Sequence, residues 1–139
     1  MSAATFHSDI RAGVRQRIVN MANKPAFAWE GVKFDPIKGT PWVTEGIRPV
    51  SSVVVSPGIG GLIAHTVLAT FTLHYPANVG TATLDAFAGL LMDEFRPGNS
   101  IAYATSNAVI HQTERMGSTQ EPDWINCAVV ITMIGHTPN

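Results

Sequence analysis

Residues 63–95, IAHTVLATFTLHYPANVGTATLDAFAGLLMDEF, contain a predicted strand, a tight turn and a predicted helix in direct succession. Between Ile63 and Tyr75 the residue types alternate. One set of positions is apolar apart from His65. The other set contains Thr66, Thr70, Thr72 and His74, interrupted by Ala64 and Leu68. A period of two is typical of a strand with one face on a core and the other toward water.

Pro76 ends the predicted strand because its ring nitrogen cannot donate to a ladder. The next four residues favour a turn, and Thr81 is placed to cap a helix. Apolar residues then recur at spacings of three and four, which predicts a helix with one apolar stripe as far as Phe95. Everything else in the chain must cover or extend this strand and helix.

The composition is that of a folded domain with few charges. At 139 residues the chain predicts a single domain, residues 1–139, with a sizeable core. Hydrophobic residues make up 45% and charged residues 14%, against a usual ~25% charged. Surface that is poor in charge is often buried in an assembly. A monomer with a surface of Ser, Thr and Asn is the alternative, and composition does not decide between the two.

Several classes of protein have no support in the sequence. A net charge of −1 gives no indication of nucleic-acid binding. The three arginines Arg11, Arg15 and Arg17 are interpreted as a solvated helix face. The single cysteine, Cys127, is interpreted as a small core residue. The first nine residues lack the pattern of a signal peptide, and no stretch approaches the ~20 apolar residues of a membrane-spanning helix. We therefore expect a soluble protein made in a reducing cytoplasm.

The remaining segments predict one more helix and several strands. They are a helix from Thr5 to Ala22, a bent strand from Phe27 to Phe34, and strands at Trp42–Val55, Ile101–His111 and Trp124–Ile134, with a polar loop at Gln112–Asp123. Pro49 predicts an edge position or a break in the second of these strands. The order favours an α+β fold of two layers, with a mostly antiparallel sheet and both helices packed on one face.

No motif establishes catalysis or a cofactor site. Gly58 to Gly61 lead into a strand, whereas phosphate-binding glycine loops lead into a helix. His65 and His74 lie on opposite faces of one strand, so that strand alone cannot bring them to a shared metal. We expect no catalytic residues, no cofactor and no metal, and we interpret the three tryptophans as packing residues.

Several short sequence motifs, taken in their order along the chain, resemble those of one known family. These motifs are Trp29–Phe34, a Gly39-Thr40-Pro41-Trp42-Val43 strand entry, Leu73-His74-Tyr75-Pro76, a helix led by Gly80, Phe95-Arg96-Pro97-Gly98, and a last strand from Trp124. Together they resemble the small tail terminator-like proteins of tailed bacteriophages. The match covers nearly the whole chain and departs from the usual pattern in the longer segment Val50–Gly61.

This resemblance implies a structural virion protein and not an enzyme. Such proteins look like subunits of a homo-oligomeric ring, typically a hexamer, that caps the tail tube, ends tail polymerisation and meets the head-completion or connector protein. The implied location is the neck region of the tail in the virion, after assembly in the host cytoplasm, with no specific nucleic acid or membrane as partner.

Two segments, Val50–Gly61 and Gln112–Asp123, are hypothesised to contact neighbours or the tube. The candidate interface residues are Arg48, Arg96, Arg115, Glu114 and Glu121. One alternative is another neck or connector subunit of the same particle. Another is a small-ligand-binding or enzymatic α+β domain that uses His65 or His74.

Overall fold

The structure is a computed structural model that describes residues 3–139, so Met1 and Ser2, which belong to the segment considered for a signal peptide, lie outside the described residues. Within residues 3–139, two helices and seven strands follow one another. They are α1 (Ala3–Val19), β1 (Ala26–Ala28), β2 (Trp42–Ser56), β3 (Leu62–Pro76), α2 (Ala82–Glu94), β4 (Ser100–Tyr103), β5 (Ser106–Arg115), β6 (Thr119–Gln120) and β7 (Trp124–Pro138). Strands make up 47% of the structure and helices 22%, so the sheet dominates.

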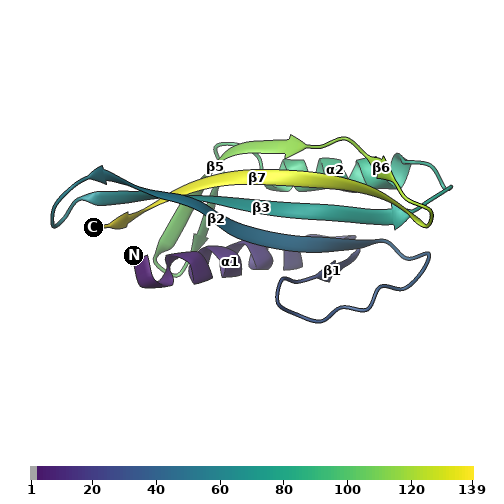
Figure 1. Cartoon of the computed structure of the whole chain (residues 1–139), viewed down its shortest axis with the longest axis horizontal. Coiled ribbons are helices and arrows are strands. Elements are labelled where there is room, and N and C mark those ends of the chain that lie inside the picture. The colour runs from purple at the N-terminus through teal and green to yellow at the C-terminus, as the bar shows by residue number, and fades with distance from the viewer. Residues whose placement is uncertain (1–2) are drawn as a thin grey trace.

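The sheet has the strand order β1-β2-β3-β7-β5-β4, with β6 paired to β7. The short β1–β2 pair is parallel and the other pairs are antiparallel. The sheet curls into a half-barrel, with α1 along one side and α2 along the other (Figure 1). The prediction of a two-layer α+β fold with both helices packed on one face is therefore wrong, because the sheet is curled and not flat.

The physical reason for the curl lies in the length and irregularity of the strands. The strands β2, β3 and β7 each have 15 residues, over which the natural right-handed twist accumulates. The register shifts between Pro49 and Ser51 in β2, and between Ile110 and Gln112 in β5. Such bulges bend a strand and increase its local twist. Alternation in the sequence shows which side of a strand is buried, but it does not show this curvature.

One hydrophobic core lies inside the curl. Val67, Phe71 and Leu73 of β3 are buried there, as the alternation in residues 63–75 predicts. The apolar stripes of both helices enter the same core, with Phe6, Ile10, Val14 and Ile18 from α1 and Leu84, Phe87, Ala88 and Leu91 from α2. Cys127 of β7 is also buried, which confirms its interpretation as a core residue.

The helix boundaries differ slightly from those predicted. The α1 helix begins at Ala3 and ends at Val19, whereas Thr5 to Ala22 was predicted. Thr81 takes the N-cap position of α2 as predicted, but its side chain makes no capping hydrogen bond. Helix ends are defined by one or two weak hydrogen bonds, so sequence patterns locate them poorly.

Three strand predictions need correction. The segment 101–111 is a hairpin of β4 and β5 and not one strand, because the chain turns at Ala104 with φ of 51°. The segment 112–123, predicted as a polar loop, contains the end of β5 and all of β6. The side chains of these strand residues are mostly exposed and polar, so the sequence shows no strand pattern there. The bent strand at 27–34 is reduced to β1, three residues long.

The prediction for Pro49 is confirmed. The edge strand β1 covers only Trp42 to Thr44 of β2, so among the residues that the structure describes no strand pairs with the outer edge of β2 at Pro49. The ladder to β3 also breaks directly after it. A proline here removes a donor that no strand would use.

Candidate assembly surfaces

A hairpin arm, defined as residues 49–62, projects from one end of the sheet. It consists of the second half of β2, a turn, and the first residue of β3, and Figure 1 shows its turn extending beyond α1. The last residues of β7 support it, since Leu62 pairs with Pro138 and the Asn139 amide donates to the Gly61 carbonyl at 2.9 Å. The arm is therefore built as an ordered extension of the ladder.

The arm exposes apolar side chains in unusual number. Its exposed large hydrophobic residues are Val50, Val53, Val54, Val55, Ile59 and Leu62. Ile59 at the turn is completely exposed. Residues 49–64 contain no Asp, Glu, Lys or Arg. Exposed edge strands normally carry charges that prevent unwanted pairing, so an uncharged, valine-rich arm indicates a surface that a partner covers.

An apolar groove lies at the other end of β3. It has a volume of about 610 Å³, and its lining includes Tyr75, Val79, Phe87 and Leu90. Of the described residues, Lys24 is the one charged residue in the lining, and its ammonium group donates to the carbonyls of Val19 and Met21. The groove thus offers an open, nearly uncharged surface between α2 and the loops around Lys24 and Gly39.

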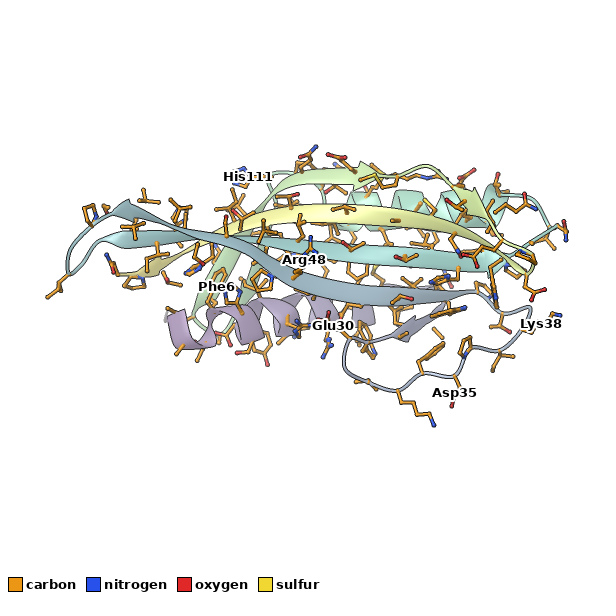
Figure 2. The ribbon with its side chains drawn as sticks, in the orientation of Figure 1. Phe6, Glu30, Asp35, Lys38, Arg48 and His111 are labelled. Atoms are coloured by element: carbon orange, nitrogen blue, oxygen red, sulfur yellow. The ribbon has the colours of Figure 1, made fainter. Side chains whose placement is uncertain are left out.

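Three of the predicted interface residues lie on or beside the outer face of the sheet. Arg48 points outward from β2 (Figure 2), and among the described residues no ion pair or side-chain hydrogen bond involves it. Glu114 lies on the outer side of β5 and accepts a hydrogen bond from Gln112. Glu121 follows β6 and accepts one from Asn126 at 2.7 Å. Arg48 is thus the candidate whose charge remains available for a partner.

The other two candidates lie near α2 and have partners within the chain. Arg96 forms an exposed ion pair with Asp93. Arg115 forms an ion pair with Asp85 of α2 at 2.5 Å and donates to the Cys127 sulfur at 3.2 Å. The hydrogen bonds to Cys127 and Asp85 raise the pKa of Arg115. Arg115 therefore links β5 to α2 within the subunit, independently of any contact that it makes with another protein.

A buried carboxylate that the sequence patterns do not indicate lies near α1. Glu45 of β2 is 2% exposed, and its carboxylate accepts hydrogen bonds from Arg15 at 2.8 and 3.0 Å and from the Glu30 amide at 3.2 Å. Arg11 pairs with Glu30, and Arg17 donates to the Glu94 and Ser100 carbonyls. The interpretation of these arginines as a solvated face is wrong, because all three bind neighbouring elements.

The two strand histidines lie on opposite faces, as predicted, and both are hydrogen-bonded. His65 is 5% exposed, and its ring nitrogens lie 2.7 Å from Ser52 Oγ and 2.8 Å from Thr137 Oγ1. His74 on the outer face donates through Nδ1 to Asn126 Oδ1 at 2.8 Å, and its Nε2 lies 3.0 Å from Thr44 Oγ1. Burial lowers the pKa of both histidines.

The tryptophans pack against other aromatic rings. Trp42 stacks on His74 with ring centroids 4.0 Å apart, and Phe34 and Trp124 contact the same indole. Trp29 stacks on Phe27. In residues 3–139 no group of three or more metal-ligating side chains is present, and no helix there is long and apolar enough to cross a membrane.

These features define a sheet-dominated domain whose distinctive parts are an exposed arm and an open groove. A family model described as phage tail terminator protein matches residues 9–132, which is most of the chain. The chain therefore belongs to the phage tail terminator family, a family of structural phage proteins. This confirms the resemblance that the short sequence motifs indicate.

Other comparisons add information about the fold. Twelve solved chains match the structure. One of them shares 12% sequence identity with a TM-score of 0.72, over 92% of this chain and 94% of that chain. At this identity the similarity shows the fold alone. No curated protein matches the sequence.

Proposed function

We propose that the protein, a single domain over residues 1–139, forms a homo-oligomeric ring, a hexamer, that caps the phage tail tube. The ring ends tail polymerisation and offers the surface to which the head-completion or connector protein binds. The observation that carries this proposal is the family match over residues 9–132. The proposed site of action is the neck region of the tail in the virion, after assembly in the host cytoplasm.

The surfaces described above support assembly. The hairpin arm and the groove are exposed, apolar and at different places on the chain. Contacts between two unlike surfaces build closed rings when the rotation between subunits closes. By the same proposal, residues 50–61 and 112–123 contact neighbouring subunits or the tube. Arg48, Arg96, Arg115, Glu114 and Glu121 are the candidate interface residues.

The test is native mass over a concentration series, combined with electron micrographs of the same sample. Six copies of the 14.9 kDa chain weigh about 89 kDa. We expect rings of this mass with an axial hole as wide as a tail tube, and added tubes capped at one end. Localisation of the protein between the portal and the cap would instead indicate a connector subunit. A monomer that leaves tube ends bare would contradict the proposal.

A further inference from the structure

The hairpin arm and the groove lie at opposite ends of the same strand. The arm joins β3 at Leu62, and the groove is lined by Tyr75 and Pro76, where β3 ends. At a rise of ~3.4 Å per residue, these two ends are roughly 48 Å apart. Because β3 is held between β2 and β7, the arm of one chain cannot reach the groove of the same chain.

We propose that the arm of one subunit occupies the groove of the next copy of this chain. The proposal rests on the proposed ring, since it names the contact that joins its subunits. It specifies the occupant of the groove as the turn of the arm, with Ile59 as the residue that enters deepest.

Charge is the first argument for this occupant. Residues 49–64 carry no charged side chain, and Lys24 of the groove is already occupied with two carbonyl groups. Burying these surfaces against each other thus desolvates no unpaired charge on the arm. A charged partner surface would leave its own charges uncompensated against the valines, which is costly.

Size is the second argument. A dry cavity of about 150 Å³ is enough to hold a benzene molecule. The groove, at about 610 Å³, therefore has room for roughly four groups of that size. The turn of the arm presents Ile59, a fully exposed apolar side chain that this volume holds together with the small residues beside it.

Geometry is the third argument. The arm ends in a turn with Gly58 and Gly60 at φ of 92° and 84°, and Gly61 approaches Ser56 so closely that a Cβ would lie 1.9 Å from the Ser56 carbonyl oxygen. The turn is therefore narrow and fixed in shape. A narrow apolar projection and an open apolar groove at opposite ends make a head-to-tail contact, the kind that closes into rings.

Cysteine pairing between copies tests the contact directly. In a Cys127→Ser background, Ile59→Cys protein is mixed with Leu90→Cys protein and oxidised with diamide. We expect a disulfide-linked pair of chains, and a ladder of linked species that ends at the ring size for the double variant. The matched control replaces Leu90→Cys by Val109→Cys, which is exposed on β5 away from the groove. Equal cross-linking to both positions would overturn the proposal.

A charge substitution gives the second measurement. Ile59 is fully exposed, so Ile59→Asp is expected to leave the fold intact. The protein concentration at which half of the chains are assembled should rise at least about tenfold. Val32→Asp, which is 58% exposed and outside the groove, is the control and should assemble normally. If Ile59→Asp forms rings as well as the natural chain, the arm contact is overturned while the ring stands. If the natural chain forms no ring, both fail.

Discussion

Arg15 of α1 and Glu45 of β2 form a partly buried ion pair in which the guanidinium Nη2 and Nε lie 2.8 and 3.0 Å from Oε1. The Glu45 side chain is fully buried, whereas the Arg15 side chain keeps 30% of its exposure. The pair joins the first helix to the edge region of the sheet beside the arm. Because the buried Glu45 carboxylate has little contact with water, the stability of the folded protein depends on the compensating charge of Arg15.

Replacing Arg15 by Met should therefore destabilise the protein. Removing one partner of a buried ion pair costs about 3–5 kcal/mol, and the partial exposure of Arg15 places the expected loss at about 2–3 kcal/mol. Urea unfolding followed by circular dichroism measures it. The control is Arg96→Met, which breaks the exposed pair with Asp93 and should cost about 0–1 kcal/mol. Equal losses for the two variants would contradict the importance of burial.

Stability should fall as the pH decreases below 6.5. Burial, followed by the charges of His7 and His136, lowers the pKa of His65 from 6.5. The unfolded chain then binds more protons than the native chain between the lowered pKa and 6.5, so stability is fully present above this window and is lost as the pH falls through it. The same sign holds for His74, whose pKa is also lowered.

Urea midpoints between pH 8 and 5 measure this dependence. His65→Gln should flatten it, because one of the two shifted groups is removed. The control is His111→Gln, at an exposed position on β5 (Figure 2), because this variant keeps both His65 and His74. A steeper fall in stability for His65→Gln would show that the sign is wrong.

Gly135→Ala should destabilise the protein by about 1–3 kcal/mol through overpacking. A Cβ at this position of β7 would lie 2.4 Å from the Phe6 ring and 2.7 Å from the Asn107 carbonyl oxygen. Gly89→Ala in α2 is the matched control, because its Cβ would meet open space and alanine favours a helix by about 0.5–1 kcal/mol. Thermal melts should therefore move in opposite directions. A shift in the same direction would refute the packing argument.

Arg48→Glu should impair ring assembly or tail joining without loss of stability. Arg48 is exposed and has no ion-pair partner in the part of the chain that the structure describes, so its replacement should change the free energy of unfolding by no more than about 0.5 kcal/mol. Sedimentation and the yield of infectious particles measure the effect. Lys33→Glu, also exposed, is the control. Normal particles from Arg48→Glu would remove this residue from the interface.

Alternation in the sequence predicts much of the core but not the shape of the sheet. The buried side of β3 follows directly from residues 63–75, because a strand repeats every two residues. The curl depends on bulges after Pro49 and Ile110, which arise from pairing between distant strands. The exposed strand residues 112–115 look like a loop for a related reason, since neither face is apolar.

The assembly surfaces were only partly predictable. The segment 50–61 stands out in sequence as a departure from the family pattern, and the structure shows it as the arm. The groove has no sequence signature because its lining comes from α2 and three separate loops or strand ends. The sequence also does not indicate the buried ion pair of Glu45, because its partner Arg15 lies thirty residues away in the chain.

The unbroken pairing of β3 with β7 has a consequence for the dimensions of the proposed ring. All residues from Leu62 to Pro76 pair with Pro138 to Trp124 without a register shift. In the proposed ring this ladder sets the spacing between subunits, because it fixes the distance between the arm and the groove. An insertion of one residue in β3 would turn every following side chain to the other face unless a bulge absorbed it, whereas an insertion of two residues keeps both faces as they are. Two more residues in β3, with matching changes in β2 and β7, would move the arm about 7 Å farther from the groove and so change the spacing of subunits in the proposed ring.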